Sequence, residues 1–205
     1  MNFIKICLAV LFLTGAVSGA AAETHDVARM DPGKGTDFYG FISKAKAKDM
    51  EKFIARLGKV TLSDELKETA SRADRPFTVV VLGYTYCPDM LIVAPFIESV
   101  RMANPNMITV RYYIRNDGYA ELLKRQTGID RTPAIFLAEP DGRLLEGRFY
   151  SKFPRIVQRL IDSSASSEES NSHIGDHRAG VYDDDVQSDL AELLRFGVPE
   201  LEGLR

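Results

Sequence analysis

The feature that most constrains this chain is an unbroken apolar stretch, Phe77 to Tyr84, that leads within three residues to a cysteine and a proline. Such a run without alternation is typical of a strand buried on both faces, and such strands belong to sheets that helices cover on both sides. A helix is predicted over Pro88 to Ala103, because proline is favoured in the first helical turn. The segment therefore predicts an α/β domain with Cys87 between a buried strand and a helix.

The segments after this helix continue the same pattern. Strands are predicted over residues 107–114, 132–138 and 143–149, and helices over residues 119–127 and 153–161. The turn at residues 139–142, Glu-Pro-Asp-Gly, joins the last two strands as a hairpin. The order β-α-β-α-β-β-α predicts a mixed central sheet flanked by helices, over residues 75–162.

The residues that precede this core predict a helical extension. Residues 23–35 contain Asp-Pro-Gly and a further glycine, and are expected to be an exposed lead-in. Within the extension, residues 36–74, one amphipathic helix is expected from Thr36 to Leu57. A second, shorter helix is expected from Ser63 to Ala73, with Ser63 as its N-cap.

The first 22 residues have the pattern of a secretory signal peptide. Lys5 supplies the positive charge, Ile6 to Val17 is apolar, and Ala20 to Ala22 places small residues where signal peptidase cleaves. A membrane anchor is the alternative, but the run is shorter than the roughly 20 residues needed to span a bilayer. We therefore expect cleavage after Ala22, a periplasmic or secreted protein, and no stable membrane insertion after cleavage.

The overall charge and the histidine content exclude several functions. The formal net charge of −3 provides no basic surface of the kind that binds nucleic acid, so no nucleic-acid partner is expected. The three histidines are scattered, and no cofactor or metal site is expected.

The C-terminal part changes composition abruptly. Residues 163–181 are rich in serine and glutamate, which predicts a flexible linker. Gly175 and its polar neighbours argue against a helix that would bring His173 and His177 to one face as metal ligands. Residues 182–205 are expected to form an acidic tail with a short helix over Asp189 to Phe196.

Cys87 is the residue that carries chemistry. Cys7 lies within the predicted signal peptide, so the mature chain retains one thiol and can form no intramolecular disulfide. At the start of a helix, unpaired backbone N–H groups and the helix dipole favour a negative charge. This position predicts a lowered pKa for the Cys87 thiol.

Three landmarks follow one another in a recognisable order: Cys87 at the helix start, Pro95 inside the helix, and Thr132-Pro133 before a later strand. In this order they resemble the thioredoxin superfamily over about residues 76–161. The resemblance implies a thioredoxin-like fold, with Cys87 as the nucleophile and a cis Pro133 beside its sulfur. The substrate-contacting residues that it implies are Tyr86, Pro88, Met90, Thr132 and Pro133.

Two positions depart from the superfamily pattern. Met90 stands where the second cysteine of the Cys-x-x-Cys pair belongs, and a thioether cannot attack a mixed disulfide. Val81 stands where thioredoxins carry the buried acid that assists the second cysteine. The sequence therefore argues against dithiol reductase or oxidase activity.

Three interpretations of Cys87 remain. In the first, it is a monothiol that forms mixed disulfides with a thiol- or disulfide-containing protein or a small thiol, with isomerase-like or glutathione-linked turnover. In the second, the fold is a non-catalytic binding module that uses the groove around Tyr86, Thr132 and Pro133. In the third, Cys87 and Met90 are soft ligands for Cu(I).

Overall fold

A computed structural model of the chain describes residues 29–115, 118, 121, 124, 128, 131–145, 149–195 and 197. The predicted signal peptide and most of the helix predicted over residues 119–127 lie outside these residues. Among the helices that are described, none has the length and apolar character needed to cross a bilayer.

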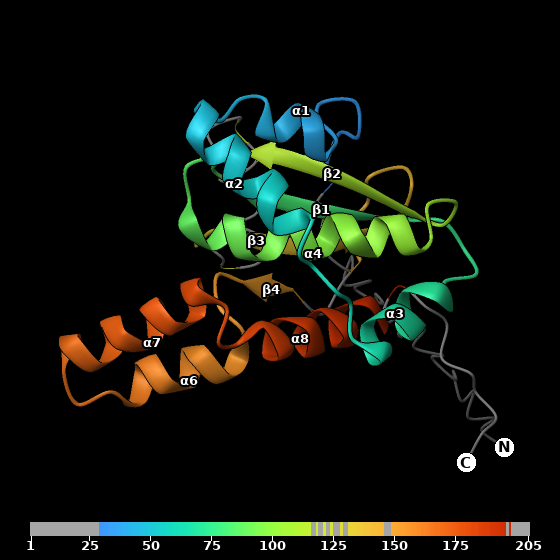
Figure 1. Cartoon of the computed structure of the whole chain (residues 1–205). Helices are drawn as coiled ribbons and strands as arrows, with labels where there is room; N and C mark the ends of the chain where they lie inside the picture. The colour runs from blue at the N-terminus through green and yellow to red at the C-terminus, as the bar shows by residue number, and fades with distance from the viewer. Residues whose placement is uncertain are drawn as a thin grey trace, which may run out of the picture.

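The centre of the molecule is a mixed sheet, as predicted (Figure 1). Its described strands are β1 (Phe77–Gly83), β2 (Ile108–Ile114), β3 (Ala134–Ala138) and β4 (Tyr150–Ser151), in the order β2-β1-β3-β4. β1 pairs parallel with β2 and antiparallel with β3, and β3 pairs antiparallel with β4. Every residue of the central strand β1 is buried, which agrees with its unbroken apolar sequence. The predicted strand at 143–149 is described only in part: Leu144 bridges to Ala138.

Helix α4 (Pro88–Ala103) has the bounds that the sequence predicts, with Pro88 in its first turn and Pro95 inside it. It packs on the face of the sheet that carries Val79 and Val81. The opposite face of β1, with Val80 and Leu82, belongs to a second apolar cluster.

The N-terminal extension differs from the prediction in two respects. The expected single helix is two, α1 (Phe38–Ile42) and α2 (Ala47–Leu57), because the Phe38 ring packs edge-on against both Phe53 of α2 and Tyr112 of β2. A single straight helix cannot fold back on itself in this way. The lead-in is also not fully exposed: Met30 is buried and its N–H donates to the Gly142 carbonyl oxygen at 2.8 Å.

The third helix of the extension confirms its predicted cap. α3 (Asp64–Ser71) begins after Ser63, whose hydroxyl accepts a hydrogen bond from the backbone N–H of Leu66. The N–H of Ser63 in turn donates to the side-chain oxygen of Gln187, at 2.6 Å. The extension is thus tied to the C-terminal part of the chain.

The predicted linker over residues 163–181 is wrong, because most of it forms a helix. α6 (Arg155–Ser163) and α7 (Ser167–Ala179) make a helical hairpin that extends from the core, at the lower left of Figure 1. Local signals explain α7: the Ser166 hydroxyl caps it by accepting from the N–H of Glu169, and Gly180 ends it with φ of 90°. The serine-rich composition concealed these signals.

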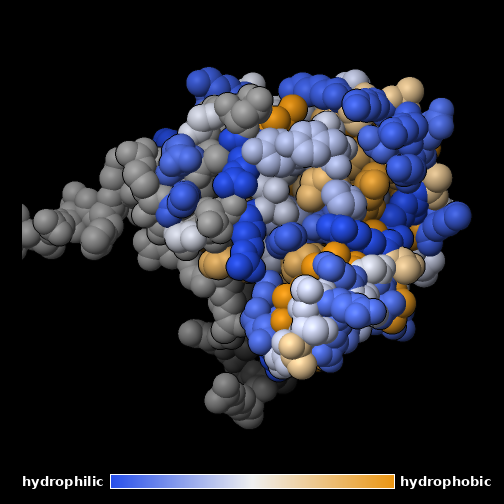
Figure 2. Space-filling model, turned by 90° about the vertical axis from the view of Figure 1, so that its left-hand side faces the viewer, coloured by the Kyte–Doolittle hydropathy of each residue, from blue (hydrophilic) through white to orange (hydrophobic). Residues whose placement is uncertain are grey.

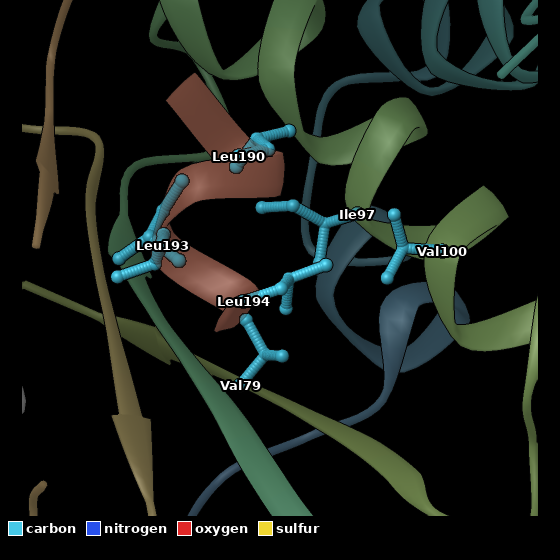
Figure 3. Close-up of a pocket in the computed structure, with 7 residues that line it drawn as sticks. Val79, Ile97, Val100, Leu190, Leu193 and Leu194 are labelled. Atoms are coloured by element: carbon cyan, nitrogen blue, oxygen red, sulfur yellow. The ribbon is translucent and has the colours of Figure 1, made fainter. Parts of the chain in front are cut away.

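The predicted acidic tail is also largely a packed helix. α8 (Asp183–Arg195) buries its leucines against α4 and β1. Figure 3 shows Leu190, Leu193 and Leu194 beside Val79 and Ile97. These side chains line an apolar gap of about 10 Å³. The acidic residues face other partners; the carboxylate of Asp183, for example, lies 2.6 Å from the Arg56 guanidinium.

Candidate thiol site

The structure brings Cys87 together with the Thr132-Pro133 pair, although 45 residues separate Cys87 from Thr132 in sequence. Cys87 is the N-cap residue of α4 and is a free, partly buried thiol. Its Sγ lies 4.0 Å from the Thr132 carbonyl oxygen, toward which the thiol donates. The Thr132–Pro133 peptide bond is cis, the isomer that the superfamily pattern implies.

The direction of the Cys87 pKa shift corrects the sequence prediction. Burial raises the pKa of the thiol, and the nearby Asp89 carboxylate raises it further. The backbone N–H groups of Met90 and Asp89 act in the opposite direction, as the helix N-terminus predicts, and so does the Arg178 guanidinium. Burial outweighs them, so the lowered pKa expected from local position is wrong.

Two tyrosines form an aromatic surface next to the cysteine. The rings of Tyr84 and Tyr86 stack with their centroids 4.9 Å apart, and Tyr86 is 69% exposed. Pro88, in the first turn of α4, is also exposed. Tyr86 and Pro88, two of the substrate-contacting residues that the resemblance implies, are therefore exposed to solvent.

Figure 2 shows the molecule from the side on which the α6–α7 hairpin extends from the core. On the visible described part of this side, apolar side chains form small patches among hydrophilic ones.

Met90 does not belong with the substrate-contacting residues that the sequence predicts. It is 0% exposed and forms part of the main apolar core. A Cβ atom added to Gly83 would lie 2.5 Å from the Met90 Sδ, so this sulfur packs directly on the backbone of β1. Met90 therefore contributes to packing beneath the site, because core atoms present no surface to a substrate.

An ion pair between α4 and α7 is the main feature that sequence reasoning missed. Asp89, two residues after the cysteine, is 1% exposed, and its Oδ1 lies 2.8 Å from the Nε of Arg178. Residue 178 falls in the segment that was predicted to be a linker, so the sequence offered no reason to pair it with the site. The sequence shows an acidic residue two positions after Cys87, but it does not show that this carboxylate is buried.

The residue before Arg178 is also buried at this junction. His177 packs edge-on against the ring of Phe153, and neither of its ring nitrogens has a hydrogen-bond partner among the described residues. Burial lowers the pKa of His177 to about 4; Asp89 opposes this shift, whereas Arg178 and Arg56 add to it.

Within the described residues, no group of three or more His, Cys, Asp or Glu side chains is arranged to hold a metal ion.

The fold and the site together define a thioredoxin-like protein with a free cysteine at the N-terminus of α4. The chain belongs to the thioredoxin family, since the family model described as Thioredoxin matches residues 35–168. The match begins before the helical extension, so the family domain is longer than the region of about residues 76–161 inferred from the motifs.

Solved structures agree with the fold. A Pseudomonas aeruginosa protein of unknown function is 20% identical, with a TM-score of 0.63, over 80% of this chain and 94% of that one. An HIV epitope-scaffold is 19% identical, with a TM-score of 0.61, over 78% of this chain and 93% of that one. Among curated proteins, none matches this chain.

Proposed function

We propose that this protein is a monothiol member of the thioredoxin family, in which Cys87 forms mixed disulfides with a protein or a small thiol. The observation that carries the proposal is the position of the Cys87 sulfur. It lies at the N-terminus of α4, facing the Thr132 carbonyl oxygen, with Met90 at the position of a resolving cysteine. A nucleophile is present there, and a resolving thiol is not.

The reaction is an exchange between one thiol and one disulfide. The Cys87 thiolate attacks one sulfur of a disulfide R–S–S–R′, and a Cys87–S–S–R bond forms while the original S–S bond breaks. The second fragment leaves as R′S⁻ and takes up a proton; the Cys87 sulfur is oxidised and the R′ sulfur is reduced. Because position 90 is a thioether, release of R requires an external thiol.

The same proposal places this exchange outside the cytosol. The apolar run Ile6 to Val17 and the small residues Ala20 to Ala22 support export. Oxidising compartments contain the protein disulfides with which a lone thiol exchanges.

A second candidate function is a non-catalytic binding module. The observation that favours it is the raised pKa of the Cys87 thiol, because a smaller thiolate fraction at neutral pH makes the thiol less reactive. In this case the exposed, stacked Tyr86 would contact a partner without covalent exchange.

The two candidate functions predict different reactivity of Cys87 when the folded protein is incubated with oxidised glutathione. We expect the wild-type protein to gain one glutathionyl group on Cys87, and the Cys87→Ser variant to gain none at that position. Mass spectrometry of the peptide that contains residue 87 measures the adduct. A wild-type protein that reacts only after unfolding would contradict the monothiol proposal and support the binding module.

Replacing Met90 by cysteine tests whether only the resolving thiol is missing. We expect Met90→Cys to form a reducible disulfide with Cys87, because their positions match the Cys-x-x-Cys spacing at the start of α4. The variant should reduce insulin slowly, since Val81 provides no proton acceptor, whereas the wild type should stay near the uncatalysed rate.

Met90→Leu is the matched control for this variant, because it keeps a large apolar side chain at a buried position without adding a thiol. It should leave insulin reduction at the wild-type level. Catalysis by the wild type, or by Met90→Leu, at a rate comparable to a dithiol thioredoxin would show that a resolving thiol is not needed.

A further inference from the structure

One partner of the ion pair beside the nucleophile, Arg178, lies beyond the matched family region. The family match ends at residue 168, and Arg178 lies in the last turn of α7. Its Nε is 2.8 Å from Asp89 Oδ1 and its Nη2 is 3.4 Å from Oδ2, so both carboxylate oxygens are engaged. Figure 1 shows that the end of α7 nearest the core is also the end nearest α4.

Asp89 acts on the Cys87 thiolate in two opposite ways. The backbone N–H of Asp89, like that of Met90, stabilises the thiolate, whereas the Asp89 carboxylate destabilises it. A nearly fully buried carboxylate is poorly screened by solvent, so its charge matters at the sulfur unless a cation balances it. Arg178 is the cation that contacts it.

We propose that Arg178 is a positioning residue for the Cys87 thiolate: docking of α7 holds the guanidinium against Asp89, where it balances the carboxylate charge beside the sulfur. Thiol reactivity therefore depends on a helix outside the strand–helix unit that carries the cysteine. This inference rests on the proposed monothiol function, because it names what controls the thiol of that same site.

A purely structural role for Arg178 makes the opposite prediction. If Arg178 only fastened α7 to the core, its loss would loosen α7 beside the first turn of α4, and any change at the sulfur would be toward greater exposure. Burial is the largest influence that raises the Cys87 pKa, so exposure would lower this pKa and speed alkylation. If Arg178 acts through its charge, its loss leaves Asp89 unbalanced and slows alkylation.

The experiment follows iodoacetamide alkylation of Cys87 in the full chain between pH 5 and pH 10, by peptide mass. For Arg178→Gln we expect the pH midpoint of alkylation to move upward and the rate at pH 7 to fall at least about threefold. Arg178→Lys, which keeps the positive charge, should restore most of the wild-type rate. Arg155→Gln is the matched control, because it removes the guanidinium that pairs α6 with Asp189 of α8 and should leave the midpoint unchanged.

Substitution of Asp89, alone and together with Arg178, completes a double-mutant cycle for this ion pair. Asp89→Asn removes the unfavourable charge and should speed alkylation, whereas Asp89→Asn with Arg178→Gln should return close to the wild-type rate. Faster alkylation in Arg178→Gln, or a midpoint that none of these variants moves, would overturn the inference. The proposed function is judged separately, by the glutathionyl adduct on wild-type Cys87, so an unmoved midpoint together with a wild-type adduct refutes only the role of Arg178.

Discussion

Replacing Leu194 by alanine is expected to lower the free energy of unfolding by about 2 to 5 kcal/mol. Leu194 is 3% exposed and packs with Val79 and Ile97 where α8 meets β1 and α4. Its truncation removes buried apolar contacts and enlarges a gap that already exists there. Urea unfolding followed by circular dichroism measures the loss.

The matched control is Val181→Ala, in the turn between α7 and α8. Val181 is 65% exposed, so this substitution should change the free energy of unfolding by less than about 0.5 kcal/mol. If Leu194→Ala were equally neutral, residues 182–195 would be the solvated tail that composition suggests, and α8 would not belong to the core.

Acidification below about pH 6.5 is expected to destabilise the protein through His177. The pKa of His177 in the folded state is about 4, below its ordinary value of 6.5, because of burial. Between these two values the unfolded chain binds a proton that the folded chain does not, so stability falls as the pH falls. The loss is about 2 kcal/mol by pH 4.5, allowing for partial solvent screening, and is measured as urea unfolding at a series of pH values.

The His177→Leu variant should lack this part of the acid sensitivity. Leucine fills a buried position beside Phe153 and leaves no unpaired ring nitrogen there. The variant should therefore become more stable than the wild type near pH 4.5. Parallel pH profiles for the wild type and His177→Leu would show that another group causes the acid sensitivity.

These expectations share one physical origin, the packing of the C-terminal helices against the thioredoxin core. α8 covers an apolar face of the sheet, and α7 reaches the first turn of α4. The polar groups that meet at this junction are Asp89, His177, Arg178, and the Arg56–Asp183 pair. A change in α7 or α8 is therefore expected to alter both the stability of the fold and the behaviour of the thiol.

Some features of the site were accessible from sequence because local rules produce them. An unbroken apolar run makes a strand buried on both faces, and Pro88 begins a helix, so Cys87 was correctly placed at the N-terminus of α4. The Ser63 cap of α3 is another local feature, because the hydroxyl and the N–H that it accepts are three residues apart.

Composition and local signals disagree in the segment that the sequence mispredicts. The abundance of serine and glutamate in residues 163–181 predicts a linker. Local signals nevertheless make α7 a helix. The Ser166 hydroxyl caps its N-terminus, Glu169 places a favourable negative charge in its first turn, and Gly180 ends it in the left-handed conformation.

The sequence by itself determined the α/β core, the position of Cys87 at the start of a helix and the absence of a cysteine at position 90, because these follow from short-range periodicity and residue identity. Only the tertiary structure decided that Met90 is a core residue, that Arg178 pairs with Asp89 from 89 residues away, and that the Cys87 pKa rises. The physical reason is that burial and charge pairing depend on which distant segments pack over a site. For Cys87, the desolvation that those segments impose exceeds the stabilisation of the thiolate by its own helix N-terminus.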